Sequence, residues 1–566
     1  MADFDEEKQN KKLEELKKQE EEDLLQAISK TKYGLPAIDL AGMGVENEAL
    51  RVISEKEARE LEIAPFKLFG KNIDIIVRSP QKELLDSLKI EIEKKGFNPV
   101  FYMGSKASLE KVWERYKELS FATTSRYGGI DISGESILEI ADKIKTIQDV
   151  EAVISGIQKE EKTHKISKML EIIMAGAIAV GASDIHIEPQ EERIRLRYRL
   201  DGILQDIMFF GNDIYRLLNS RIKLISGLKI TSEKRAQDGR FSIFIKEDEV
   251  SIRTSIIPGA YGESTVMRIL DPNQTKGNIN ELGIEPKLFE IIDKEIKKPH
   301  GLILITGPTG SGKTTTLYAF LRKIYSTEKK IITIEDPIEY HLEGITQTQV
   351  EDKKGYTFLE GLRSALRQDP DIIMVGEIRD KETAKTSVES ALTGHLVFST
   401  IHTNNAAGVI PRLIELDIDP KILVSALSLS IAQRLVRKLC TVCKKEKTPT
   451  KEDEDRIRTI LKKAVEEGKD LSQFNISPDQ PIKLWEAVGC DACNKTGYKG
   501  RIGVFEAIVT DESIETIIPE NPSEREIKKI AQKQGILDMK EDGIIKTLNG
   551  ITSLEEVESV VDIEED

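Results

Sequence analysis

Residues Ile303 to Tyr318 read ILITGPTGSGKTTTLY and combine an apolar segment, a glycine-rich turn and a lysine followed by threonine. In the pattern G-x4-G-K-[ST], backbone N–H groups turn toward phosphates, the lysine binds the β and γ phosphates, and the hydroxyl reaches Mg²⁺. We therefore expect ATP with Mg²⁺ as the ligands. The candidate nucleotide contacts are Gly307, Pro308, Thr309, Gly310, Ser311, Gly312, Lys313, Thr314 and Thr315, with Thr314 also on the metal.

Acidic residues follow two further apolar segments that we expect to be strands of the same parallel sheet. They are Glu377 after residues 371–375, and Glu335, Asp336 and Glu339 after residues 331–334. Ligands bind at the carboxyl edge of such a sheet, so these acids are expected near the glycine-rich turn. Glu377 is expected to hold Mg²⁺ through its water shell, and another acid to orient or deprotonate the attacking water. The alternative for any one of them is a solvated loop acid.

Two histidines flank the apolar segment LVFST, residues 396–400. They are His395 and His402, in a chain with only six histidines. A lone histidine is more often structural than functional. Two of them at the ends of sheet segments in a nucleotide domain are candidates for contacts with the γ phosphate.

All four cysteines occur as two C-x2-C pairs, Cys440 with Cys443 and Cys490 with Cys493. Four thiolates in two tight turns can close a tetrahedral Zn²⁺ site. Disulfides are the alternative, which an intracellular chain disfavours. We expect structural zinc.

The length, composition and net charge of the chain limit the classes of protein to which it can belong. The chain has 566 residues, of which 39% are hydrophobic and 32% charged, with a net charge of −15. This length needs several domains, and the acidic balance argues against nucleic acid as the main partner, although a local basic patch stays open. Apolar runs are too short for a membrane span, and Met1 to Leu25 is too charged for a signal peptide, so we expect a cytoplasmic protein without a membrane span.

Changes in pattern along the sequence suggest seven parts. They are a charged, helical or frayed segment (1–32), a small N-terminal α/β domain (33–120), a linker (121–150), a second domain (151–275), a nucleotide domain (276–436), a four-cysteine module (437–505) and a helical region (506–566). The second domain starts with an apolar helix at 166–180 and continues through four strand-like segments. One of them, Arg193 to Leu200, alternates arginine with apolar residues, which predicts a strand whose arginines form a solvated face.

The motifs GPTGSGKTTT, IEDPIEY, RQDPDIIMVGEIRD and TGHLVFSTIHTN resemble, in order and spacing, those of the secretion ATPases that power type II secretion and type IV pilus assembly. The similarity covers about Gly181 to Glu506. It implies an α/β multidomain fold in which a RecA-like P-loop core follows a PAS-like α+β domain, assembled as a homohexamer. The implied roles are Glu339 as general base, Glu377 as Walker B acid, His395 and His402 as γ-phosphate sensors, and Arg240, Arg253 and Arg268 as arginines that reach the phosphates.

The same resemblance also implies whether the motor extends or retracts a filament and which proteins it binds. Assembly members carry a similar four-cysteine module and retraction ATPases lack it, which implies a motor for pilus extension or secretion. The N-terminal domain resembles the family's docking domain for an inner-membrane platform protein, through which pilin-like subunits are assembled. It has no RLGxxL-type motif, and whether it binds cyclic di-GMP stays open, as does the machine served.

Two other classes of protein are compatible with the nucleotide motif. One is a RecA-like hexameric motor that depends on nucleic acid, which the acidic charge and the absence of an aromatic and basic stripe disfavour. The other is a scaffold that binds nucleotide without hydrolysis. Intact Lys313, Glu339 and Glu377 argue against it.

Overall fold

The computed structural model describes residues 29, 34–40, 45–50, 52–53, 55–69, 72–94, 97–116, 134–157, 165–232, 234–245, 248–271 and 278–563. Their contacts divide the chain into two units, Met1–Ser136 with Ser242–Phe244 and Ile137–Phe241 with Ile245–Asp566. Apart from residue 29, the predicted charged segment at 1–32 lies outside the described residues, as does the part of the predicted linker before residue 134.

The first unit contains a three-stranded sheet in the order β1-β2-β3, with β1 antiparallel and β3 parallel to β2. Its elements are α2 (Asn47–Leu50), α3 (Glu55–Glu60), β1 (Ile63–Phe69), β2 (Asn72–Val77), α4 (Lys82–Lys94), β3 (Asn98–Met103) and α5 (Lys106–Tyr116). The chain crosses from β2 to β3 through α4, whose Leu88 and Ile92 are buried at helical spacing. The helices and strands that an α/β domain requires are therefore present in this segment.

The second unit begins with two helices where we expected a linker. They are α6 (Gly134–Ala141), which lies within the predicted linker, and α7 (Ile147–Ile157), which extends across its predicted end at residue 150. Ile137, Val150 and Ile154 are buried, and this apolar spacing supports helices despite the glycine-rich and serine-rich residues just before them.

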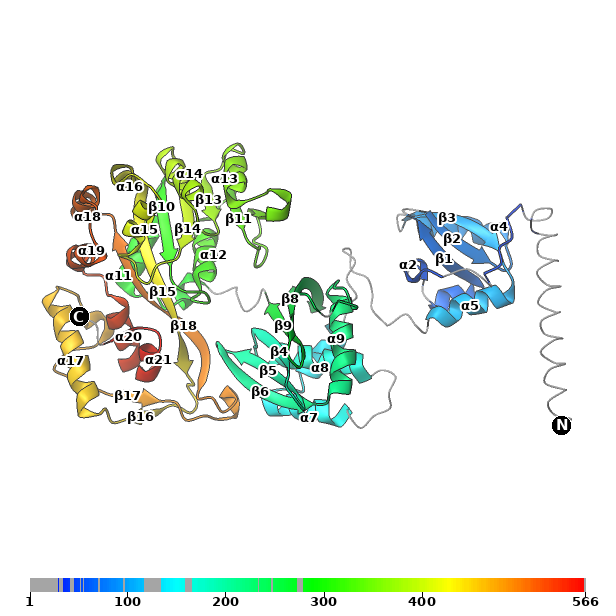
Figure 1. The fold of residues 1–566 in the computed structure, drawn as a ribbon, viewed down its shortest axis with the longest axis horizontal. Helices are drawn as coiled ribbons and strands as arrows, with labels where there is room; N and C mark the ends of the chain where they lie inside the picture. Colours follow the sequence, from blue (N-terminus) through cyan, green and yellow to red (C-terminus); the bar gives the residue numbers. More distant parts are fainter. Residues whose placement is uncertain are drawn as a thin grey trace. The chain divides into compact units, whose positions relative to one another are not determined.

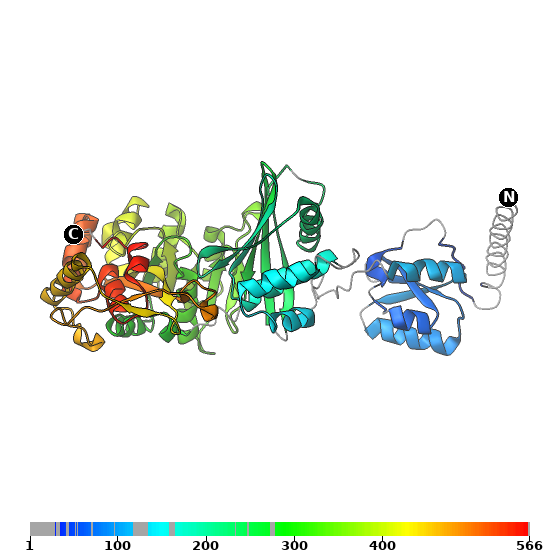
Figure 2. The ribbon, with the colours of Figure 1, turned by 90° about the horizontal axis from the view of Figure 1, so that it is seen from below.

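A six-stranded sheet in the order β6-β5-β4-β9-β8-β7 comes next along the chain. Its elements are α8 (Lys165–Ala179), β4 (Asp184–Pro189), β5 (Ile194–Leu200), β6 (Ile203–Phe210), α9 (Asn212–Ile225), β7 (Gln237–Ile245), β8 (Asp248–Gly259) and β9 (Gly262–Leu270). The predicted helix is α8, but the sequence patterns revealed only four of the six strands. In β5 the apolar residues are buried and the arginines alternate with them, and Tyr198 Oη donates to Ile173 O in α8 at 2.6 Å. The helix α8 therefore covers the apolar face of this sheet (Figures 1 and 2).

The nucleotide domain is built on a seven-stranded sheet in the order β12-β11-β13-β14-β10-β15-β18. Its strands are β10 (Gly301–Thr306), β11 (Ile331–Glu335), β12 (Thr346–Gln349), β13 (Ile372–Val375), β14 (Leu396–Ile401), β15 (Leu427–Leu439) and β18 (Tyr498–Val509). Its α-helices are α11 (Pro286–Glu295), α12 (Lys313–Ile324), α13 (Phe358–Leu366), α14 (Lys381–Leu392), α15 (Val409–Glu415) and α16 (Pro420–Ala426). The first six strands are parallel, as the alternating pattern of strands and helices predicts, and β18 is antiparallel to β15.

The strand β15 extends past the boundary predicted at residue 436, because it continues to Leu439 and pairs with β18. The four cysteines therefore lie in an insertion between two strands of the main sheet. The insertion holds β16 (Lys445–Lys447), α17 (Lys451–Glu466) and β17 (Leu484–Glu486), and the chain ends with α18 (Glu512–Ile517), α19 (Glu524–Ala531), α20 (Met539–Leu548) and α21 (Leu554–Glu558). Short 3-10 helices connect these elements at Ile279–Glu281, Asp352–Lys354, Ser472–Phe474, Asp491–Cys493, Ile518–Glu520 and Gln532–Gln534.

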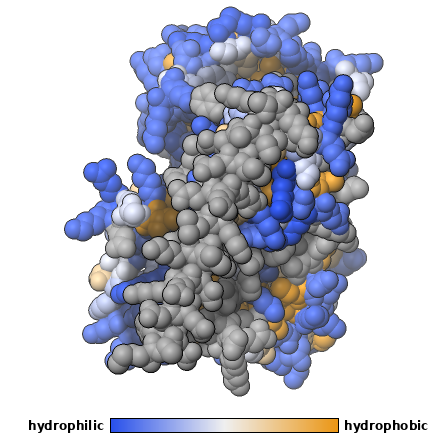
Figure 3. Space-filling view, turned by 90° about the vertical axis from the view of Figure 1, so that its right-hand side faces the viewer, coloured by the Kyte–Doolittle hydropathy of each residue, from blue (hydrophilic) through white to orange (hydrophobic). Residues whose placement is uncertain are grey.

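On the face drawn in Figure 3, hydrophilic side chains predominate and apolar ones form scattered patches. Of the helices that the structure describes, none combines the length and the apolar character needed to cross a bilayer.

Candidate active site and metal centre

The glycine-rich turn, Gly307 to Gly312, connects β10 to α12 and is held in a form that requires glycine. Gly307, Gly310 and Gly312 have φ values of 144°, 81° and 89°. A Cβ atom added at Gly307 would lie 2.4 Å from Gln433 O, and one at Gly312 would lie 2.9 Å from Gln433 Nε2. The neighbouring strand β15 therefore packs so closely that side chains larger than glycine are excluded, which is typical of a phosphate-binding loop.

Two polar groups in this loop fit a phosphate ligand. The Oγ atom of buried Ser311 has no hydrogen-bond partner within the described part of the chain. Lys313 Nζ donates to Gly307 O at 2.9 Å and to Pro308 O at 3.0 Å, and burial lowers the pKa of this lysine. Phosphate oxygens would accept hydrogen bonds from both groups at the N-terminus of the 12-residue helix α12. The loop thus fits the polyphosphate of a nucleotide.

Glu377 follows β13 and lies at the same edge of the sheet as the loop. Its Oε2 is 3.5 Å from His402 Nε2, and its carboxylate forms an ion pair with Arg379 that raises the pKa of the arginine. The Glu377 charge also acts on Lys313. The predicted convergence of Glu377, His402 and the loop is therefore present in the structure.

His395 does not join this group. It precedes β14, its carbonyl accepts from Gly301 N at the start of β10, and its Nδ1 lies 3.0 Å from Ser390 O. The loop, in contrast, comes after the end of β10. A strand of six residues separates the two edges by about 20 Å at a rise of about 3.3 Å per residue. The two histidines therefore lie at opposite edges of the sheet, and the structure does not bring His395, a predicted γ-phosphate sensor, to the glycine-rich loop.

The acids after β11 take different positions. Glu335 is buried and its carboxylate accepts from Thr333 Oγ1 at 2.5 Å, from Gln347 Nε2 at 3.0 Å and from Tyr318 Oη. Burial raises the pKa of Glu335. Its carboxylate is thus engaged by side chains of the fold, which leaves its predicted nucleotide contact without support. Asp336 is exposed, and its charge acts on Arg379.

Glu339 lies further along the same loop and meets an arginine from the six-stranded sheet. Arg253 Nη1 is 3.6 Å from Glu339 Oε2, and Arg253 Nη2 donates to Ile338 O at 2.6 Å. Burial lowers the pKa of Arg253, and the nearby charge of Glu339 opposes that change. Arg240 and Arg268 are close enough to act on the same guanidinium. The three predicted arginines therefore gather beside the predicted general base.

Another cation, which sequence reasoning did not identify, lies beside the loop. Arg434 of β15 donates from Nη2 to Asn404 O at 2.6 Å, and its Nη1 is 3.1 Å from the position of a Cβ at Gly307. Its charge acts on Lys313. The alternating pattern of LSLSIAQRLVRKL predicts a strand, but its position next to β10 is a property of the sheet topology. We therefore add Arg434 to the candidate phosphate contacts.

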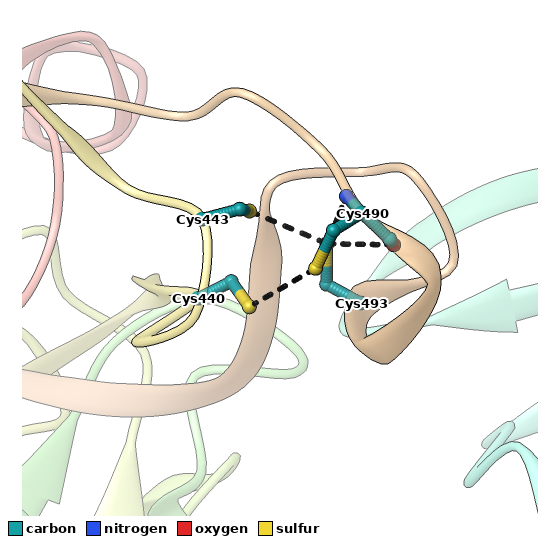
Figure 4. A group of neighbouring side chains, drawn as sticks. All are labelled: Cys440, Cys443, Cys490 and Cys493. Carbon is teal, nitrogen blue, oxygen red and sulfur yellow. Dashed lines mark hydrogen bonds between the residues drawn. The ribbon is translucent and has the colours of Figure 1, made fainter.

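The four cysteine sulfurs form one cluster (Figure 4). Their Sγ atoms all lie within 4.8 Å of one another, with 3.9 Å between Cys440 and Cys490 and 3.8 Å between Cys443 and Cys493. In a tetrahedral Zn²⁺ site with bonds of about 2.3 Å, sulfur atoms are about 3.8 Å apart. A disulfide would need about 2.05 Å. The cluster therefore fits four thiolates around one metal ion.

Backbone groups also favour a thiolate at Cys493. Its Sγ accepts from Cys490 N and Gly497 N, each at 3.2 Å. Burial alone would raise the pKa of this thiol, but the hydrogen bonds outweigh it and lower the pKa, whereas burial raises the pKa of the Cys443 thiol in the same cluster. A metal ligand must be deprotonated, so this environment supports the assignment.

Comparisons with known proteins find similarity along most of the chain. The sequence model of the family described as Type II/IV secretion system protein matches residues 159–559. The type IV pilus assembly ATPase PilB of Thermus thermophilus is 38% identical over 541 residues, which cover 95% of this chain and 57% of that protein. The type II secretion system protein E of Pseudomonas aeruginosa is 41% identical over 428 residues, which cover 75% of this chain and 80% of that protein.

Among solved structures, the ATPase DotB of Yersinia pseudotuberculosis aligns with a TM-score of 0.50 at 21% identity. The alignment covers 72% of this chain and 95% of DotB. At this identity the comparison supports the fold. It agrees with the mixed α/β multidomain fold described above.

Proposed function

The chain belongs to the type II/IV secretion system protein family and is an ATP hydrolase of that family, and we propose that it is a homohexameric motor that assembles pilin-like filaments. The filament is a type IV pilus during extension or the pseudopilus of type II secretion. The observation that carries the proposal is the contact of Arg253, on the six-stranded sheet, with the loop of Glu339 on the nucleotide domain.

Each residue of the site has a task in the proposed hydrolysis. The loop N–H groups and Lys313 bind the phosphates, and Thr314 with Glu377 would hold Mg²⁺, which neutralises charge on the β and γ phosphates when bound. Glu339 orients the attacking water and accepts its proton. His402, which lies beside Glu377, is positioned to respond to the γ phosphate.

The arginines couple this chemistry to motion. An arginine that neutralises charge on the transferred phosphoryl group accelerates hydrolysis only while it is in place. Arg240, Arg253 and Arg268 are carried by a domain other than the one that binds the phosphates. Hydrolysis and phosphate release therefore change the contacts between the two domains. In a hexamer, six such changes can be passed on to a partner.

We assign the docking of that partner to the N-terminal α/β unit. The partner is an inner-membrane platform protein or a cytoplasmic assembly protein, and the motor works at the cytoplasmic face of the membrane. The four-cysteine cluster supports filament assembly over retraction, because the family resemblance implies that assembly members carry such a module and retraction ATPases lack it.

Loss of the chain from its source organism is expected to abolish surface filaments or protein secretion, and the wild-type gene is expected to restore them. Electron microscopy of filaments and assay of secreted protein measure the two outcomes. Normal filaments together with normal secretion in the deletion strain would refute the proposed function.

An ATPase assay on the purified protein distinguishes the proposed filament motor from the rival class, a motor that depends on nucleic acid. A motor that depends on nucleic acid is stimulated by its substrate, whereas an acidic filament motor is not. ATP turnover is therefore expected to stay unchanged when single-stranded DNA, duplex DNA or RNA is added. Stimulation of several-fold by any of them would favour the nucleic-acid motor.

We further propose that the cysteine cluster holds one structural Zn²⁺ per chain. Cys440→Ser removes a buried ligand and is expected to abolish zinc binding and to lower the melting temperature by on the order of 10 °C, because metal binding stabilises the fold of its site. Atomic absorption and thermal melting measure the two effects. Val442→Ala, in the same turn at a side chain that is 73% exposed, is the matched control and should retain zinc. A wild-type chain purified without metal and with four reactive thiols would contradict the assignment.

A further inference from the structure

A row of charged side chains crosses the six-stranded sheet on the face opposite α8. The strand register pairs Arg253 of β8 with Arg268 of β9, Arg268 with Asp184 of β4, and Asp184 with Arg199 of β5. Directly paired residues of neighbouring strands point to the same face of a sheet. The row therefore starts at the arginine that contacts Glu339 and continues to an acid that the proposed hydrolysis has not used.

Asp184 is the most buried charged residue of this row. It is 4% exposed, whereas the side chains of Arg268 and Arg199 are 60% and 34% exposed. Arg268 Nε donates to Asp184 Oδ1 at 2.9 Å, and Arg199 Nε lies 3.5 Å from Oδ2. Ser183 Oγ also donates to Oδ2, at 2.8 Å. The carboxylate is thus fixed by contacts on both oxygens.

Arg268 is held at its Nε atom, which leaves its terminal nitrogens, Nη1 and Nη2, available to bind a ligand. Asp184 binds the inner nitrogen, Nε, and among the described residues no hydrogen bond of Arg268 Nη1 or Nη2 occurs. These two nitrogens form the end of the guanidinium fork that binds phosphate oxygens in pairs. A guanidinium anchored at Nε loses little further freedom when the fork binds. A free, mostly exposed arginine would lose more.

We propose that Asp184 is a positioning residue, whose buried carboxylate holds Arg268 by Nε and presents the two terminal nitrogens to the phosphates of ATP. The inference rests on the proposed role of Arg268 in hydrolysis. Asp184, the first residue of β4, thereby has a role in ATP hydrolysis in addition to its place in the sheet.

The test separates positioning from a purely structural role. Asp184→Asn is expected to lower kcat about 10- to 100-fold through misplacement of Arg268, with the KM for ATP changed less than about 2-fold. In an Arg268→Ala background the same change is expected to lower kcat by less than about 2-fold, because two residues that act through one group are not additive. Steady-state kinetics of the four proteins measure this. An equal loss of kcat in both backgrounds would overturn the proposal.

A second variant covers the case in which Asp184→Asn does not fold. Arg268→Lys keeps the charge at an exposed position but has neither the Nε anchor nor the fork. It is expected to lower kcat to a similar extent as Asp184→Asn. A kcat close to that of wild type would show that charge alone is needed, and would refute positioning.

The control is Glu188→Gln, on the same strand and the same face. Glu188 pairs with Arg197, at 2.6 Å, and does not contact Arg268. Its kcat should stay within about 2-fold of wild type, since the partners of Glu188, Arg197 and His186, are not among the residues proposed to act in hydrolysis. If Arg268→Ala lowers kcat while Asp184→Asn does not, the inference fails and the proposed function stands. If Arg268→Ala itself has wild-type kcat, the role proposed for Arg268 in hydrolysis fails as well.

Discussion

Replacing Glu339 by glutamine is expected to lower kcat for ATP hydrolysis by about 10²- to 10⁴-fold, the usual contribution of a general base. The amide keeps the size and one hydrogen-bond acceptor of the carboxylate but cannot take a proton from water. ATP binding should be retained, because the loop and Lys313 are unchanged. The variant should therefore bind ATP and hold it.

Glu339 is distinguished from its neighbours by its partner. It contacts Arg253, whereas the carboxylate of Glu335 is engaged by three side chains of the fold. Single-turnover hydrolysis and binding of a fluorescent ATP analogue measure the two expected effects. Glu343→Gln is the matched control, an exposed acid four residues further along the same loop. Wild-type turnover in Glu339→Gln would exclude this residue as the base and direct attention to Asp336.

Much of this site could be predicted because a parallel sheet converts sequence order into position. The motifs that begin at Gly307, Glu335 and Glu377 each come directly after an apolar strand, and the carboxyl ends of parallel strands meet at one edge of the sheet. The same rule explains why His395 lies away from the other predicted residues. That residue precedes its strand, whereas His402 lies just after it, so only the second reaches the nucleotide edge.

The features that sequence reasoning missed depend on contacts between distant segments. Arg434 is about 120 residues from the loop that it approaches, and its strand lies beside β10 only because of the order of strands in the sheet. The strand β18 comes after a long insertion, so its pairing with β15 leaves no local signal. The contact of Asp184 with Arg268 likewise joins two strands that are adjacent only in space. Local patterns predict elements well, but side-chain partners across a sheet need the register.

Replacing Lys313 by alanine is expected to remove the cation that binds the β and γ phosphates, and to lower kcat/KM for ATP by at least about 100-fold, the loss typical of one preorganised donor to a developing charge. In the structure without nucleotide, Lys313 Nζ donates to Gly307 O and Pro308 O. These bonds hold the lysine in the loop, so no side-chain rearrangement across the domain is needed when phosphate binds. Unlike Glu339→Gln, this variant should lose affinity for ATP as well as turnover, since the lysine contacts both the bound substrate and the transition state.

The affinity for ATP distinguishes the role of Lys313 in phosphate binding from the role of Glu339 as general base. Equilibrium binding of ATP to both variants, alongside kcat, should show near wild-type affinity for Glu339→Gln and weakened affinity for Lys313→Ala. Lys323→Ala is the control on the same helix, because its Nζ pairs with Asp293 at 2.8 Å, away from the loop. If Lys313→Ala hydrolysed ATP at the wild-type rate, the phosphates would have to bind elsewhere or be held by Arg434, the other cation beside the loop. The double variant with Arg434→Ala then measures how the two cations share the phosphate charge.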